Sequence, residues 1–166
     1  MFDEPTTALA TEVLALCRAR GWRVATVESC TGGLVAGALT AIAGSSDVVL
    51  GGLVTYSNAA KSALAGVPAS LIEAKGAVSE PVARAMAERG VGRLHADICV
   101  AITGVAGPGG GSEAKPVGLV HFGCATTGGG TVHAERRFGP LSRDEIRRLS
   151  VIVALDMLKS AALSRG

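Results

Sequence analysis

The stretch WRVATVESCTGGLVAGALTAIA, residues 22–43, combines a β-branched segment, a polar glycine-containing turn and an Ala-rich apolar segment. It predicts a strand over residues 22–28, a turn at residues 29–33 and a helix over residues 34–43. A strand that runs directly into a helix is the building unit of α/β domains, so this stretch sets the fold class.

Elements of the same kind extend outward from this unit. Residues 7–20 have apolar side chains at helical spacing, and Gly21 is a typical C-terminal cap. The other expected elements are a strand over residues 48–57 in which Gly51-Gly52 favours a bulge, short helices at 58–64 and 67–74, a helix opened by Ser79 and Pro81 that runs to about Arg89, a strand over 97–103, a loop over 105–116, a hairpin of residues 117–126 and 131–138, and a last helix capped by Ser142.

This order predicts a three-layer α/β/α sandwich on a mixed, five-stranded sheet with one antiparallel hairpin strand. The chain has 166 residues, which fits one domain over residues 1–166 with no linker. Hydrophobic residues make up 48% of the chain and aromatic residues only 3%. The core is therefore expected to consist of Ala, Val, Leu and Ile.

Composition also argues against several classes of function. The net charge is +2, with 16 basic and 14 acidic residues interspersed, which gives no patch for nucleic acid. Glycines and charges interrupt every apolar run, so no membrane span is expected, and residues 1–5 do not resemble a targeting signal. The four cysteines form no CxxC motif, which favours a reducing compartment, the cytoplasm. No metal or nucleotide-cofactor motif occurs, so we expect neither a metal nor a cofactor.

Ser29 stands at the end of the first expected strand, where a ligand crevice of an α/β sheet is usually found. Backbone N–H groups of the following turn, with the helix dipole, can stabilise an oxyanion there, and Gly32 and Gly33 let a substrate approach the backbone. These features make Ser29 a candidate nucleophile. The alternative is that Ser29 or Thr31 only caps the helix.

A nucleophilic serine needs a base. His95, His121 and His133 lie away from the strand end that bears Ser29, and we expect them to be solvated or structural. Lys61 follows the second strand end among small apolar residues, where desolvation can make a lysine neutral and basic. Tyr56 can position this lysine or relay a proton, although a solvated surface lysine remains the alternative.

The Gly-rich loop over residues 105–116 contains Ser112-Glu113-Ala114-Lys115, which matches the SxxK pattern of penicillin-recognising enzymes. Those enzymes place the motif at a helix start, whereas here Pro116 disfavours helical geometry at Lys115. We interpret the loop instead as a clamp for a phosphate, with a plain surface loop as the alternative. Cys30 is expected to pack rather than react, because no His is placed to activate it.

Several strings in this order resemble the CinA carboxyl-terminal domain family, and the likeness covers roughly residues 7–163. The strings are VESCTGG at 27–33, VTYSN at 54–58 followed by Lys61, GAVSE at 76–80, TGVAGP at 103–108 and KPVG at 115–118. The resemblance implies hydrolysis of the carboxamide of nicotinamide mononucleotide to nicotinic acid mononucleotide and ammonia. It also implies that activity tied to the family's amino-terminal pyrophosphatase-like domain is missing here.

Residue by residue, the resemblance implies Ser29 as nucleophile, Lys61 as catalytic lysine and Tyr56 as a supporting residue. The family's last helix opening matches residues 142–147, which leaves open whether Arg143 or Arg147 meets the substrate. The residues expected to bind substrate are Cys30, Thr31, Gly32, Gly33, Thr103, Gly104, Gly107, Ser112, Arg143 and Arg147.

The expected partners are thus a small nucleotide substrate and, from the resemblance, a second copy of the chain in a homo-oligomer, with a dimer favoured. No nucleic acid or membrane partner is expected. The alternative to an enzyme is a nucleotide-binding or competence-associated regulatory module that keeps the fold without turnover.

Overall fold

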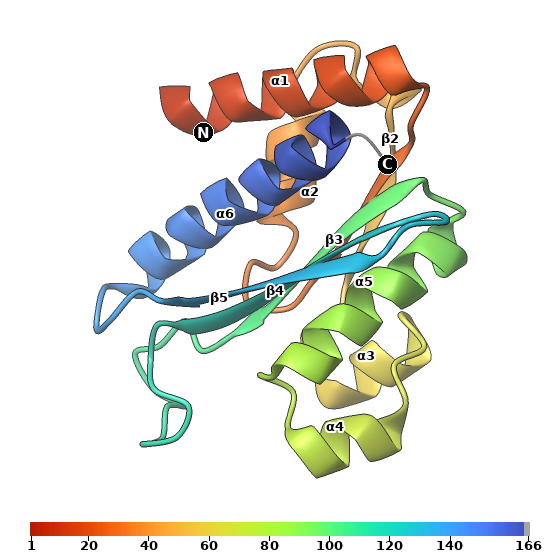
Figure 1. Ribbon diagram of the computed structural model, residues 1–166. Coiled ribbons are helices and arrows are strands. Elements are labelled where there is room, and N and C mark those ends of the chain that lie inside the picture. The colour runs from red at the N-terminus through yellow and green to blue at the C-terminus, as the bar shows by residue number, and fades with distance from the viewer. Residues whose placement is uncertain (165–166) are drawn as a thin grey trace.

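The computed structural model describes residues 1–164, which form a five-stranded sheet with helices on both faces (Figure 1). The elements in chain order are α1 (Glu4–Arg20), β1 (Val24–Glu28), α2 (Leu34–Thr40), the 3-10 turn η1 (Ser45–Asp47), β2 (Val49–Val54), α3 (Asn58–Ala63), α4 (Ala69–Lys75), α5 (Glu80–Leu94), β3 (Ile98–Gly104), β4 (Leu119–Thr126), β5 (Thr131–Arg137) and α6 (Arg143–Leu163).

The strand order is β2-β1-β3-β4-β5. Strand β1 pairs in parallel with both β2 and β3, while β4 is antiparallel to β3 and to β5. One strand, β4, therefore opposes the other four, and the predicted mixed sheet is confirmed. The carboxyl ends of β2, β1 and β3 lie side by side as a result.

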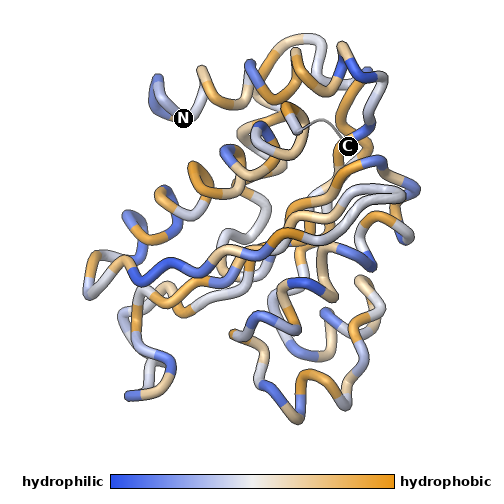
Figure 2. The backbone as a smooth tube through the Cα atoms, viewed as in Figure 1, coloured by the Kyte–Doolittle hydropathy of each residue, from blue (hydrophilic) through white to orange (hydrophobic). Residues whose placement is uncertain are grey.

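Helices α1, α2 and α6 cover one face of the sheet, and α5 covers the other with α3 and α4 beyond it (Figure 1). Each face has its own apolar cluster, one beneath α1, α2 and α6 and one beneath α4 and α5. Apolar colour concentrates along the sheet's middle strands and the inner helix faces, whereas the carboxyl-terminal part of edge strand β5 is hydrophilic (Figure 2). The predicted three layers and aliphatic core are confirmed.

Strand β1 is buried along its whole length, and its side chains alternate between the two faces. Val24 joins the cluster beneath α2, whereas Ala25 and Val27 join the cluster beneath α5. On the α5 side, Gly90 allows close approach, because a Cβ there would collide with Cys99 Sγ and Val27 Cγ2. Small residues thus let the helix lie directly on the sheet.

Several local predictions are confirmed. Gly21 ends α1 with φ 67°, and Ser142 opens α6 in a capping box with Glu145. The hairpin of β4 and β5 forms as expected. Strand β2 has its bulge near the glycine pair, since Val24 pairs with Val49 and Ala25 already pairs with Gly51.

Other boundaries differ from the prediction. Helix α1 starts earlier, at Glu4, because the Asp3 side chain accepts a hydrogen bond from Thr6 N. Helix α5 runs past its glycines to Leu94, since tertiary packing outweighs their low helix propensity. Ser79 stands at the N-cap position of α5, but its hydroxyl donates to Gly76 O instead of capping the helix.

The four cysteines are buried and free. None of the helices within residues 1–164 has the length and apolar character that crossing a membrane requires.

Candidate active site

Ser29 lies in the middle of three adjacent strand ends. The last residue of β1, Glu28, pairs with Val54 of β2 and with Ile102 of β3. Just beyond, Ser29 N donates to Ile102 O at 2.9 Å, and Thr55 N donates to Glu28 O at 2.8 Å. Backbone hydrogen bonds therefore hold the first residue of the turn firmly between its neighbours.

A cavity of about 250 Å³ opens at these strand ends. It brings together residues from the turn after β1, the segment after β2, the α4–α5 connection, the end of β3 and the start of α6. The lining residues are Ser29, Cys30, Tyr56, Asn58, Lys61, Ala77, Val78, Thr103, Gly104, Ala106 and Arg143.

The Ser29 hydroxyl faces Lys61, with 2.8 Å between Lys61 Nζ and Ser29 Oγ. Helix α3 supplies the lysine: Ser57 caps this short helix by accepting a hydrogen bond from Ala60 N, and Lys61 lies in its last turn. Helical side chains slant toward the helix N-terminus, so Lys61 reaches back to the strand end. The alternative that Ser29 caps the helix is wrong, because its hydroxyl takes no part in a cap.

Lys61 is 1% exposed, so the alternative of a solvated surface lysine is also wrong. Its Nζ contacts only neutral oxygens: Ser29 Oγ, Thr55 O at 2.9 Å and Tyr56 O at 3.4 Å. Within residues 1–164 it forms no ion pair. Burial lowers the pKa of Lys61 below its ordinary value of 10.5.

The arrangement suits a neutral amine. Its two N–H groups can donate to the carbonyls of Thr55 and Tyr56, which leaves the nitrogen lone pair facing the Ser29 hydroxyl. A buried amine at hydrogen-bond distance from a serine hydroxyl has the geometry of a base with its nucleophile.

Glu28 is a residue that the sequence interpretation missed. Its carboxylate is 1% exposed and accepts hydrogen bonds from Val35 N at 2.9 Å, Ala36 N at 3.0 Å and Thr26 Oγ1 at 3.1 Å. It therefore caps α2 from the preceding strand. A negative charge already occupies this helix N-terminus, so the predicted contribution of the helix dipole to an oxyanion is largely offset.

Tyr56 and Arg143 meet at the mouth of the cavity. Tyr56 is 62% exposed, and Arg143 Nη2 donates to its phenol oxygen at 3.1 Å. Arg143 Nη1 donates to Gly107 O at 2.7 Å. Lys61 contacts the backbone carbonyl of Tyr56 and not its phenol. The structure therefore does not support the expected proton relay by the phenol.

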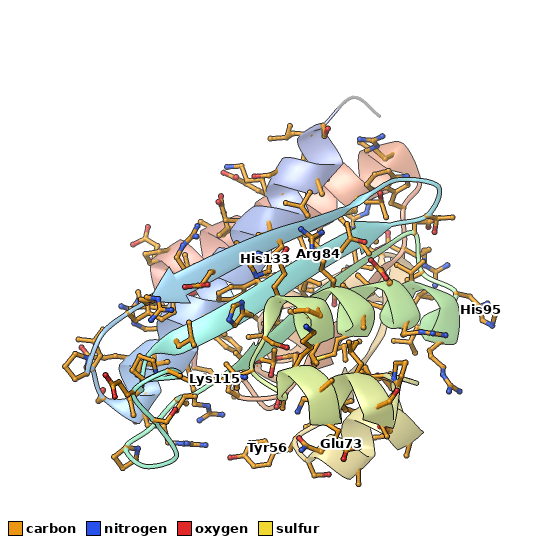
Figure 3. The ribbon with its side chains drawn as sticks, turned by 60° about the horizontal axis from the view of Figure 1, so that its bottom comes forward. Tyr56, Glu73, Arg84, His95, Lys115 and His133 are labelled. Carbon is orange, nitrogen blue, oxygen red and sulfur yellow. The ribbon has the colours of Figure 1, made fainter. Side chains whose placement is uncertain are left out.

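Tyr56 and Lys115 both lie at the end of the molecule that carries the Gly-rich loop (Figure 3). Lys115 Nζ donates to Lys75 O at 2.9 Å, which ties this loop to the end of α4. Ser112 Oγ accepts from Lys115 N, so the SxxK pair only closes the loop on itself.

Thr103 Oγ1 donates to Ala77 O at 2.8 Å and fixes the α4–α5 connection against the end of β3. Ala77 and Val78 thereby become a wall of the cavity. With Asn58 and Ala106, they are lining residues that the sequence interpretation did not select. Ala77 and Val78 belong to the GAVSE string at 76–80, which contributes to the family resemblance. Nothing in the composition of that string indicates a catalytic or binding role.

Three residues of the turn that were expected to bind substrate do not line the cavity. Thr31 is fully buried, and its Oγ1 has no hydrogen-bond partner among the described residues. Gly32 and Gly33 serve the backbone, because their φ angles of 58° and 97° carry the chain from β1 into α2.

Two residues of the Gly-rich loop are also absent from the lining. Gly107 has φ 73° and offers its carbonyl to Arg143, and a Cβ at this position would overlap Val117 Cγ1. Ser112 is exposed and bonded within its own loop. The expected direct contacts of both residues with substrate are not supported by the geometry.

The two candidate arginines of α6 separate clearly. Arg143 lines the cavity, whereas Arg147 lies behind the turn, with its Nε 3.2 Å from Cys30 O and its Nη2 3.4 Å from Thr31 O. Arg147 borders a different cavity of about 390 Å³ beside the start of α1. The expectation that Arg147 binds substrate is therefore not supported.

Cys30 is 5% exposed, and burial raises the pKa of its thiol to about 12, so it stays protonated near neutral pH. His121 Nδ1 and His133 Nε2 lie 2.9 Å apart, and His133 lies beside Arg84 in Figure 3, between the hairpin and α5. Neither histidine lines the Ser29 cavity. Within residues 1–164, no cluster of three or more His, Cys, Asp or Glu is arranged to hold a metal ion.

The chain matches the family model described as "CinA C-terminal domain" over residues 6–162. A "CinA-like protein" of Synechococcus sp. (strain RCC307) is 54% identical over 159 residues, which are 95% of this chain and 38% of that protein. The chain thus spans about 38% of the length of this curated relative.

Solved structures agree with this match. The crystal structure of the "competence/damage inducible protein CihA" from Agrobacterium tumefaciens superposes with a TM-score of 0.96 at 46% identity and covers 99% of each chain. A "Competence-Damaged Protein (CinA) Superfamily Protein" from Klebsiella pneumoniae gives 0.89 at 35% identity, over 95% of this chain and 97% of that one. Taken with the family match, these likenesses show that the chain belongs to the CinA C-terminal domain family.

Proposed function

We propose that this protein is an amidohydrolase that converts nicotinamide mononucleotide to nicotinic acid mononucleotide and ammonia. The observation that carries the proposal is the 2.8 Å contact between Ser29 Oγ and the Nζ of Lys61, a buried lysine whose nitrogen contacts only neutral oxygens. The choice of substrate rests on the family resemblance.

In the first step, neutral Lys61 accepts the Ser29 proton while Ser29 Oγ forms a bond to the carboxamide carbon. The carbonyl oxygen becomes an oxyanion, which the backbone N–H group of Cys30, a residue that lines the cavity, can stabilise. Lys61 then returns the proton to the amide nitrogen, the C–N bond breaks and ammonia leaves. Water, deprotonated by Lys61, attacks the acyl-enzyme, and Ser29 regains its proton.

The mouth of the cavity supports a nucleotide as substrate. Arg143 lines it and keeps a permanent positive charge, which suits the substrate's phosphate. The Tyr56 phenol lies beside this guanidinium and is exposed enough to meet a ligand. In this proposal Tyr56 and Arg143 bind the nucleotide end, while Ser29 and Lys61 act on the carboxamide.

The direct test is an assay of the purified protein for ammonia and nicotinic acid mononucleotide. We expect turnover by the wild type, a loss of at least about 10³-fold for Ser29→Ala, and no change for Ser70→Ala, an exposed serine on α4. A Ser29→Ala variant with wild-type activity would rule out the mechanism.

The same assay separates the alternatives. Nicotinamide, which lacks ribose and phosphate, is expected to turn over far more slowly than the nucleotide, because it cannot reach Arg143. If the folded wild type binds nicotinamide mononucleotide in calorimetry but releases no ammonia above a heat-killed control, the chain is a binding module and the proposal is wrong.

A further inference from the structure

The turn that carries Ser29 is held from behind by a guanidinium group. Arg147 extends from α6, is half-buried, and directs Nε to Cys30 O and Nη2 to Thr31 O. It forms no ion pair within residues 1–164, so its charge acts on these two peptide carbonyls. Hydrogen bonds from a charged donor are stronger than neutral ones.

These contacts fix where the neighbouring N–H groups point. In a trans peptide the C=O and the following N–H are antiparallel, so the N–H groups of Thr31 and Gly32 point away from Arg147. Gly32 N donates to Ser29 O at 3.1 Å, which closes the turn. Thr31 is fully buried and does not line the cavity, so Arg147 acts on the course of the turn and not on a donor exposed to substrate.

The second anchor of the turn is Glu28, whose carboxylate takes the N–H groups of Val35 and Ala36. The residues between the two anchors have little freedom, because Glu28 holds the helix after the turn and Arg147 holds the carbonyls within it. The buried Thr31 hydroxyl contributes no hydrogen bond of its own. The orientation of the Thr31 peptide therefore depends on Arg147.

We propose that Arg147 is a positioning residue: by holding the Cys30 and Thr31 carbonyls, it fixes the turn that presents the Ser29 hydroxyl to Lys61 and to the substrate. This role rests on the proposed function: Arg147 positions the nucleophile from behind the turn, whereas Arg143 lines the cavity and binds the substrate.

The kinetic test compares Arg147→Ala with Arg148→Ala. Arg148 borders the same rear cavity but pairs with Asp3 on the surface, which makes it a matched control. We expect Arg147→Ala to lower kcat by about 10- to 100-fold with KM changed less than about threefold, since a small misplacement of the reacting groups can cost about 10²-fold in rate. Arg148→Ala is expected to keep both constants.

The rear cavity of about 390 Å³ leads to the space that Arg147 vacates, which allows chemical rescue. Millimolar guanidinium ion is expected to restore part of the kcat of Arg147→Ala and none of the activity of Ser29→Ala. A raised KM with unchanged kcat would overturn the proposal, because Arg147 would then contact substrate. Unchanged kcat and KM would overturn it too.

A readout that does not need turnover separates this inference from the proposed function. Amide hydrogen exchange of a peptide covering residues 29–36 is expected to accelerate in Arg147→Ala, to stay unchanged in Arg148→Ala and to recover with guanidinium. If the wild type proves inactive, the proposed function fails while this comparison still tests whether Arg147 holds the turn. Unaltered exchange in Arg147→Ala would refute the positioning role.

Discussion

Two charged side chains, Glu28 and Lys61, lie beside Ser29 with 1% exposure each, yet their surroundings differ. The Glu28 carboxylate receives three hydrogen bonds from fixed donors, two of them backbone N–H groups of α2. Lys61 Nζ contacts a hydroxyl and two carbonyls, none of which carries a charge. Both oxygens of Glu28 thus accept hydrogen bonds, whereas burial without a counter-ion lowers the pKa of Lys61.

The difference separates a structural charge from a reactive one. Burial is equally deep in both cases, so burial alone does not identify the chemical group. The hydrogen-bond partners distinguish the two groups. A carboxylate whose oxygens both accept hydrogen bonds stabilises the turn, whereas a buried amine without a counter-ion can exchange a proton with its neighbour.

The largest effect is expected from Lys61→Met, which keeps much of the side-chain length but removes the base. We expect kcat to fall by about 10³-fold or more, because general bases contribute about 10²–10⁴ and this one also returns the proton to ammonia. Steady-state ammonia release measures the loss, and Lys75→Met on the exposed end of α4 serves as control. Residual activity above one tenth of wild type would assign the base elsewhere.

A pH profile is expected to show the next largest effect. The neutral amine is the active form and burial lowers the pKa of Lys61, so activity is present above this lowered pKa and is lost as the pH falls through it. Below that point, log kcat/KM is expected to rise by about one per pH unit. A flat profile across the range in which the protein stays folded would contradict the assignment.

Glu28→Gln tests the structural member of the pair. Gln can accept with only one oxygen, so one of the two α2 N–H groups loses its partner, at a cost of about 1–3 kcal/mol of unfolding free energy. Activity is expected to fall by about tenfold or less, since Ser29 and Lys61 both remain. Urea denaturation measures the cost, with Glu73→Gln on exposed α4 as control; an unchanged midpoint would show that the capping bonds contribute nothing.

The smallest effect is expected from Thr31→Val, which replaces a buried hydroxyl that has no partner among the described residues. Loss of an unsatisfied polar group is neutral or stabilising, so the unfolding free energy is expected to change by less than about 1 kcal/mol or to rise. Activity within about twofold of wild type would agree with the structure. A larger loss would return Thr31 to the substrate-binding role that its sequence position suggests.

Most of the fold could be predicted from sequence because its signals are local. The glycine cap at Gly21, the capping serine at Ser142 and the hairpin each depend on residues within a few positions. The end of α5 was placed too early because glycine lowers helix propensity locally, whereas packing against the sheet is a tertiary effect.

The site was predictable only in part. Ser29 and Lys61 follow strand ends, and strand ends meet in a parallel sheet. Glu28 was missed because its partners are the N–H groups of α2, which no side-chain pattern reveals. Arg143 and Arg147 are four positions apart on one helix face, so only the packing of α6 decides which of them meets the cavity and which meets the turn.

Because side chains alternate between the two faces along β1, the site depends on the correct alignment of this strand with its neighbours. Glu28 faces α2 and Ser29 faces Lys61 because successive residues of a strand point to opposite faces. A slip by one residue would turn the Glu28 carboxylate toward Lys61, and the nearby negative charge would favour the protonated form of this amine in an ion pair. The bulge of β2 lies opposite the start of β1, and the pairing from Ala25 to Glu28 that follows it is unbroken. This regular pairing keeps the Glu28 carboxylate and the Lys61 amine on opposite faces of the sheet.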